Sequence, residues 1–276
     1  MRRMLRFPDF KSKAVTLSYD DGKVQDKRLI SIMSKYGLKG TFNINSGFFT
    51  MDKSRLTADE VLKLYSESGN EVALHGYKHL SLSEVDSAMA INDVIEDRKA
   101  LEKLFGKVIK GMAYPNGFYS NEVVEMLKMC GISYSRTTVS TEKFDLPTDW
   151  LRLPATCHHN NPRLMELAKQ FVESEDGRHF WWNHSKLFYL WGHSYEFDDK
   201  QNWNVIEEFA AYIGGRENIW YATNVEIYEY VQAFDRLEFS ADGERVYNPS
   251  AIDVYIQSLK GNLLVPAGKT AAFKSH

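Results

Sequence analysis

The stretch VTLSYDDGK, Val15 to Lys23, ends an apolar run with two adjacent aspartates and a glycine. The carboxylates of Asp20 and Asp21 repel each other, and burying either one without a partner is costly. A surface turn would explain the pattern, because Asp-Gly is a common turn dipeptide. The residues around this stretch decide between a turn and a functional site.

Short strand-like runs alternate with amphipathic patterns along most of the chain. We predict strands at Ala14–Tyr19, Gly40–Asn45, Glu71–His75, Ile109–Pro115, Ile132–Thr138, Leu187–His193 and Ile219–Thr223. Apolar stripes between them predict helices, with Leu29, Met33 and Tyr36 on one face, Ala88, Ile91 and Ile95 on another, and Leu164, Leu167 and Phe171 on a third. Repeated strand and helix predict an α/β fold with a parallel sheet, open or closed. About seven such units favour a barrel short of the usual eight.

The character of the sequence changes after Phe234, where short strand-like segments surround turns and no helical pattern follows. We therefore predict a (β/α) barrel over residues 1–235 and a short β appendage over residues 236–276, packed on the barrel. So short a segment would hardly fold alone.

Composition limits the classes of partner. The net charge is −3 and Lys and Arg do not cluster, so we expect no nucleic-acid partner. No apolar run approaches the ~18 residues of a membrane span, so we expect no membrane partner. Cys130 and Cys157 are predicted to be buried thiols. Residues 1–13 carry no apolar signal segment, which predicts a cytoplasmic location unless a secretory signal has been trimmed.

The ends of the predicted strands carry the titratable groups. In parallel α/β folds, chemistry sits at the carboxyl ends of strands. The first strand delivers Asp20 and Asp21, the third His75 and His79, and the sixth His193. The fourth delivers a Pro-Asn-Gly turn at 115–117.

His75 and His79 are four residues apart, a spacing that on a helical turn lets two imidazoles share a metal. Such a pair also arises by chance or on a helix surface. Together with an aspartate from another strand end, it gives two histidines and one carboxylate with open positions, which is a catalytic metal arrangement. If Gly22 lets the chain bend, Asp20 and Asp21 can face one cavity, where one binds the metal and the other stays free as a base.

Four segments in order, SYDDG, HGYKH, YPNG and LFYLWGH, resemble the motifs of the polysaccharide deacetylases, carbohydrate esterase family four. The resemblance runs from Val15 to Tyr230. It implies a distorted (β/α) barrel and a metal-dependent hydrolase that removes acetyl groups from an N- or O-acetylated sugar or polysaccharide.

The resemblance also implies residue roles. Asp20 matches the catalytic base and His193 the catalytic acid, while Asp21, His75 and His79 match the ligands of one divalent ion, most often zinc. Asn116 matches the position whose backbone N–H contributes to the oxyanion hole. The flanking aromatic residues are candidates for stacking on a sugar ring, with core packing as the alternative: Tyr77, Tyr114, Trp191 and Tyr195.

The sequence departs from the family pattern in three places. Gly76 replaces a usual Ser or Thr, which we expect to matter little. Ala113 replaces the Arg that orients the base, and Arg136 on the next strand is a candidate substitute or an ordinary surface ion pair. The fourth motif survives only poorly, as Asp145, Asp149 and Trp150.

Some alternatives stay open at this stage. A carboxylate beside His193 would raise its pKa, and either Asp149 or Glu196 could supply it. His158 and His159 are expected in a loop, lining the cleft or solvated. The competing functions are a metal-dependent amidohydrolase acting on a small non-sugar amide, and an inactive carbohydrate-binding relative.

Overall fold

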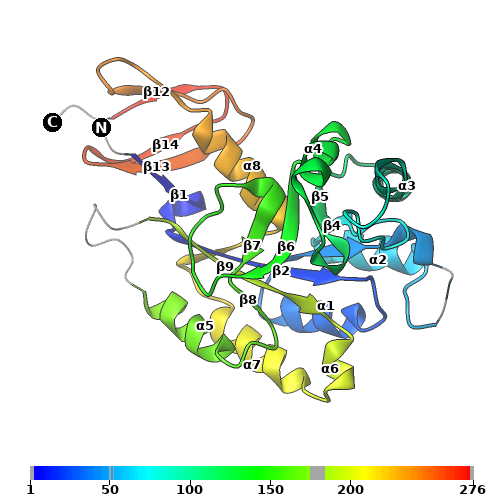
Figure 1. The fold of residues 1–276 in the computed structure, drawn as a ribbon. Coiled ribbons are helices and arrows are strands. Elements are labelled where there is room, and N and C mark those ends of the chain that lie inside the picture. The colour runs from blue at the N-terminus through cyan, green and yellow to red at the C-terminus, as the bar shows by residue number, and fades with distance from the viewer. Residues whose placement is uncertain (1–2, 50, 52, 175–183, 274–276) are drawn as a thin grey trace.

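A parallel sheet runs through the centre of the computed structural model, which describes residues 3–49, 51, 53–174 and 184–273 (Figure 1). In spatial order its strands are β7 (Leu153–Ala155), β6 (Tyr134–Ser140), β5 (Gly111–Ala113), β4 (Glu71–Leu74), β3 (Gly40–Ile44), β2 (Lys13–Asp20), β9 (Lys186–His193) and β8 (Cys157–His158), with β10 (Ile219–Tyr221) also paired to β2. Each of the seven predicted strands is present, and the α/β class is confirmed.

The two edges of this sheet meet at residues 153–158. β7 pairs with β6, β8 pairs with β9, and only Thr156 separates β7 from β8. The Thr156 N–H donates to the Tyr189 carbonyl at 2.8 Å, within β9. The sheet therefore curls into a distorted, barrel-like core, as predicted. β7 and β8 were not predicted, because runs of three and two residues show no periodicity.

Helices surround the curved sheet. They are α1 (Asp26–Lys35), α2 (Ala58–Ser68), α3 (Ser87–Phe105), α4 (Asn121–Met129), α5 (Leu164–Glu173), α6 (Glu196–Asp199), α7 (Trp203–Ile213) and α8 (Asn224–Asp235). Short 3-10 turns lie at Pro8–Phe10, Ser46–Phe48, Pro115–Gly117 and Trp150–Arg152. Among the described residues, no helix is both long and apolar enough to cross a bilayer.

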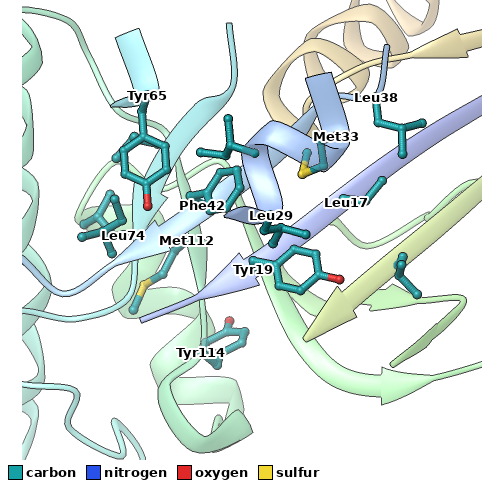
Figure 2. Packing of buried hydrophobic residues seen from close by; sticks show 14 of the residues in the cluster. Leu17, Tyr19, Leu29, Met33, Leu38, Phe42, Tyr65, Leu74, Met112 and Tyr114 are labelled. Atoms are coloured by element: carbon teal, nitrogen blue, oxygen red, sulfur yellow. The ribbon is translucent and has the colours of Figure 1, made fainter. Parts of the chain in front are cut away.

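The main core lies between the outer face of the sheet and these helices (Figure 2). Leu17 and Tyr19 of β2 pack there against Leu29 and Met33 of α1. Side chains alternate along a strand, so the residues between them, including Ser18, face the inside of the barrel. The apolar alternation of β2 thus fixes Asp20 on the interior side.

The inner face of α3 differs from the prediction. Ile91 is 39 % exposed and Ala88 is also exposed, whereas Asp93 and Asp97 are buried. The two carboxylates hydrogen-bond to the loops at the ends of β3 and β4, so acidic side chains point inward where apolar ones were expected. A search for apolar residues at helical spacing assigns aspartates such as these to the solvent face of the helix.

The C-terminal segment forms two small antiparallel sheets. One contains β11 (Glu238–Phe239), β12 (Arg245–Tyr247) and β15 (Thr270–Ala272). The other contains β13 (Val254–Ser258), β14 (Gly261–Val265) and the N-terminal strand β1 (Arg3–Arg6). A domain boundary at residue 235 stays a prediction, but β1 belongs to the same sheet as β13 (Figure 1).

Candidate active site

Polar side chains fill the inside of the barrel near the carboxyl ends of the strands. Asp20, the last residue of β2, lies in register with Asn43 of β3 on one side and His193 of β9 on the other. Arg136 of β6 enters the same space and is 1 % exposed. Buried polar groups need hydrogen-bond partners, and here they find one another.

Asp20 is buried and held at both carboxylate oxygens. Its Oδ2 accepts a hydrogen bond from Nη2 of Arg136, and its Oδ1 accepts one from Nδ2 of Asn43 at 2.8 Å. Burial acts to raise the pKa of Asp20, but the guanidinium of Arg136 together with the imidazoles of His75 and His193 outweighs burial and lowers this pKa to about 2. Asp20 is therefore an anion at neutral pH. Arg136 contacts Asp20 directly, and so it is not a surface ion pair.

The chain bends directly after Asp20. Asp21 has φ 82° and Gly22 has φ 62°, so both residues lie in the left-handed region. The Asp21 N–H donates to the Asn43 carbonyl at 2.9 Å, and Nη1 of Arg55 donates to the Asp21 carbonyl at 2.6 Å. This bend turns the Asp21 side chain towards the two histidines in the loop after β4. Arg55 lies in a loop that gave no signal in the sequence.

Asp21, His75 and His79 offer ligand atoms that all lie within 4.8 Å of one another. Nε2 of His79 lies 3.2 Å from Nε2 of His75 and 3.8 Å from Oδ1 of Asp21. Nδ1 of His75 lies 2.9 Å from the Ala113 carbonyl and donates to it, which leaves the Nε2 lone pair facing the other ligand atoms. Burial lowers the pKa of His79 to about 4, with a further contribution from His75. Two imidazoles and a carboxylate are a donor set that fits a divalent ion.

Two aspartates of α3 hold the loop that carries both histidines. Oδ2 of Asp97 accepts from the His75 N–H at 3.0 Å, and its Oδ1 accepts from the Ser46 N–H at 2.8 Å. Oδ1 of Asp93 accepts from the Lys78 N–H at 2.7 Å. These bonds fix the backbone on either side of Gly76.

Gly76 is required, contrary to the expectation that its change from Ser or Thr matters little. Its φ is 77°, and a Cβ atom there would lie 2.5 Å from Oδ2 of Asp93. Any larger residue would both strain the backbone and displace the carboxylate. The glycine and the aspartate are thus packed as a pair.

His193 faces Asp20 from the opposite side. Its Nε2 lies 3.9 Å from Oδ2 of Asp20, and its Nδ1 lies 2.8 Å from Oε1 of Glu196. Burial acts to lower the pKa of His193, but the hydrogen bond to Glu196 and the charge of Asp20 outweigh it and raise this pKa above its ordinary value. Glu196, and not Asp149, is the carboxylate beside His193. Asp149 instead pairs with Arg152 at 2.6 Å.

Glu196 also contacts His158 and His159. Their Nε2 atoms lie 3.6 and 3.2 Å, respectively, from carboxylate oxygens of Glu196. These three residues also have ligand atoms within 4.8 Å of one another. However, Nδ1 of His158 accepts from the Asn160 N–H at 3.1 Å, so in the neutral ring Nε2 carries the proton. A protonated Nε2 cannot bind a metal. This tautomer favours the group at His75 as the metal site, while His159 is buried and not in a solvated loop.

The four aromatic candidates have different positions. Tyr114 belongs to the core in Figure 2, where its hydroxyl donates to the Leu151 carbonyl at 2.8 Å, so its ring is unavailable to a sugar. Trp191 is buried under the guanidinium of Arg136, whose Cζ lies 4.3 Å from the ring centroid. Tyr195 and Tyr77 are only partly buried. The Tyr195 ring lies 5.3 Å from that of His193, so it is an aromatic surface beside His193.

Asn116 lies on the turn after β5, with φ 57°. Its side chain is exposed and donates to Oγ of Ser81 at 3.0 Å. Pro115, which precedes it, lies against the loop of the histidine ligands, since a Cβ on Gly76 would be 3.3 Å from its Cγ. The turn therefore borders the group of ligand atoms.

Comparison with known proteins agrees with this geometry. The polysaccharide deacetylase family matches residues 8–135. YxkH, an inferred polysaccharide deacetylase of Bacillus subtilis, is 24% identical over 127 residues, which is 46% of this chain and 45% of that protein. The peptidoglycan deacetylase of Helicobacter pylori is 26% identical over 121 residues, 44% of this chain and 39% of that protein. The chain thus matches less than half of the length of each of these relatives.

A solved structure extends the likeness to most of the fold. The crystal structure of an inferred polysaccharide deacetylase from Mycobacterium smegmatis superposes with a TM-score of 0.61 at 17% identity, covering 84% of this chain and 94% of that one. The matched residues 8–135 include the Asp-Asp-Gly bend, both histidine ligands and the Pro-Asn-Gly turn. Residues 8–135 therefore match the polysaccharide deacetylase family, and the solved structure shares the fold of most of the chain.

Proposed function

We propose that this protein is a metal-dependent deacetylase that hydrolyses acetyl groups from an N- or O-acetylated sugar or polysaccharide. One observation carries the proposal. A buried, ionised Asp20 lies beside the ligand atoms of Asp21, His75 and His79, and the imidazole of His193 lies 3.9 Å from Oδ2 of Asp20. A base, an acid and a metal site close together are what metal-assisted acyl hydrolysis requires.

Asp21, His75 and His79 would hold one divalent ion, with zinc the first choice for this donor set. Bound there, the ion supplies Lewis-acid polarisation of a carbonyl oxygen. The chain prepares the site in two ways. Ala113 fixes the tautomer of His75, and Asp97 fixes the backbone of the same residue.

Asp20 is assigned as the general base. It accepts one proton from the attacking water while the water oxygen bonds to the acetyl carbon. Arg136 keeps the carboxylate ionised, and it takes the place of the arginine that the family carries at position 113. The backbone N–H of Asn116 is assigned to the developing oxyanion, where the loss of one donor typically costs ~10²–10³ in rate.

His193 is assigned as the general acid. When the bond between the acetyl carbon and the sugar nitrogen or oxygen breaks, the leaving atom takes a proton from Nε2 of His193. The products are acetic acid, which ionises to acetate, and the free amine or hydroxyl. Return of the proton from Asp20 to His193 restores both groups for the next turnover. Glu196 favours the protonated imidazole that this step needs. Tyr195 is the first choice for a sugar-stacking surface.

The test combines elemental analysis with acetate release from a panel of acetylated sugars, polysaccharides and small non-sugar amides. We expect one divalent ion per chain and acetate release only from the carbohydrates. Turnover of the small amides alone would favour an amidohydrolase. Sugar binding without turnover would identify an inactive relative.

A further inference from the structure

We propose that Asn43 is a positioning residue that fixes the rotation of the Asp20 carboxylate, an inference that rests on the proposed role of Asp20 as base. Asn43 is the fourth residue of β3, lies in register with Asp20 and is 0 % exposed. Its Nδ2 donates to Oδ1 of Asp20 at 2.8 Å and to Oγ of Ser18 at 2.9 Å.

The two oxygens of Asp20 have different surroundings. Oδ2 accepts from Arg136 and lies 3.8 Å from Nε2 of His75, on the side of the ligand atoms. The same Oδ2 atom also faces Nε2 of His193. A carboxylate held at one oxygen alone can still rotate about its Cβ–Cγ bond. Because Asn43 holds Oδ1, Oδ2 is kept towards the place where water and substrate would meet.

The orientation of the Asn43 amide follows from its surroundings. Three acceptors lie around Nδ2: Oδ1 of Asp20, Oγ of Ser18 and, at 3.4 Å, the Tyr19 carbonyl. The reversed amide would direct its oxygen at the Asp20 carboxylate and the Tyr19 carbonyl, neither of which can donate a proton, and this is repulsive. The NH₂ group therefore faces Asp20.

Asn43 is itself held by a chain of hydrogen bonds inside the barrel. Ser18, its second acceptor, forms a hydrogen bond with Tyr189, and the Tyr189 hydroxyl accepts from Nδ2 of Asn224 at 2.6 Å. The hydrogen bonds to Asp20 and Ser18 together limit rotation of the Asn43 amide. An apolar residue in place of Asn43 would leave Oδ1 of Asp20 buried without this donor, which is unfavourable.

The test compares Asn43→Leu, which keeps the bulk and removes the donor, and Asn43→Ala, which removes both, with the matched control Asn248→Leu. Asn248 is also 0 % exposed and its Nδ2 donates twice, to Ile252 and Val265 at 2.8 and 2.9 Å, but it lies in the C-terminal segment. We expect kcat to fall by about 10- to 100-fold in both Asn43 variants, because misplacement of a reacting group by an ångström can cost ~10². KM and metal content should stay near the parental values, and Asn248→Leu should lose thermal stability but not kcat.

A double variant separates positioning from a general structural role. In an Asp20→Asn background the base is already absent, so Asn43→Leu should lower kcat little further. Parental kcat in Asn43→Leu, equal losses in Asn248→Leu, or losses that multiply in the double variant would each overturn the inference. If the parent protein releases no acetate from any substrate, the proposed function fails and the inference fails with it.

Discussion

Arg136 reaches Asp20 across the inside of the barrel, from β6 to β2, although three strands separate these two in the sheet and 116 positions separate them in sequence. Trp191 of β9 lies against the same guanidinium. Arg136 thus contacts Asp20 through space from one strand, whereas the family pattern places an arginine on the neighbouring strand. The contact is an ion pair between groups that are both buried.

Replacing Arg136 by Met should be strongly disruptive. The substitution leaves Asp20 buried without its countercharge, and breaking one side of a buried ion pair costs about 3–5 kcal/mol. We expect a lower free energy of unfolding in chemical denaturation, and little acetate release from the folded fraction. Arg136→Lys keeps the positive charge but loses the forked guanidinium. Its stability and its acetate release should therefore lie between those of the parent and of Arg136→Met. A stable, fully active Arg136→Met would show that Asp20 does not need this partner.

His75→Ala should remove the metal. The variant deletes one of three ligands and leaves only His79 and Asp21, which are too few for a tight site. Elemental analysis of the purified proteins is the measurement, with His184→Ala as the control, because His184 is exposed and outside the ligand group. Equal metal content in His75→Ala and the parent would refute the site.

Asp20→Asn should abolish turnover and keep the metal. The amide is nearly isosteric but cannot accept a proton, so we expect the rate to fall by ~10²–10⁴. Asp21→Asn is the informative neighbour, since it should lose metal affinity as well as turnover. Loss of the metal in Asp20→Asn, or near-parental activity, would mean that the two aspartates exchange roles.

His193→Ala should slow the reaction by roughly 10²–10⁴ without changing metal content. The loss should shrink for a substrate with a good leaving group, because such a group departs with less protonation. Rates on an aryl acetate and on an acetylated sugar amine measure this difference. Equal proportional losses on both substrates would favour a structural role for His193.

Glu196→Gln should move the alkaline limb of the pH–rate profile to lower pH. The acid form of His193 is the active one, so activity falls as the pH rises through its pKa, and this pKa is raised in the parent. Burial, which lowers the pKa, stays in the variant, whereas the carboxylate that opposes it is lost. The measurement is kcat/KM against pH for the two proteins. An unmoved alkaline limb would show that another group sets it.

Much of the fold could be read from the sequence, because hydrophobic periodicity marks strands and helices locally. The same rule failed at α3, where Asp93 and Asp97 point inward because distant loops satisfy their carboxylates. The ends of the strands gave Asp20, Asp21, His75 and His79 as a group. The residues that support them gave no signal, since Asn43 reads as part of a strand and Arg55 as part of a loop. Their roles depend on contacts between elements far apart in sequence, which no local pattern records.

The pairing of β1 with β13 joins two parts of the chain that are made at different times. Arg6 hydrogen-bonds to Gln257, 251 positions later, so β1 cannot pair with β13 until that whole stretch has been synthesised. Contacts at such separation close late and slow folding, and an unpaired strand edge invites association with other chains in the meantime. A shortened protein ending at residue 235 would keep that edge unpaired for its whole lifetime. We therefore expect residues 236–276 to limit aggregation during folding, although the candidate active site lies in the barrel.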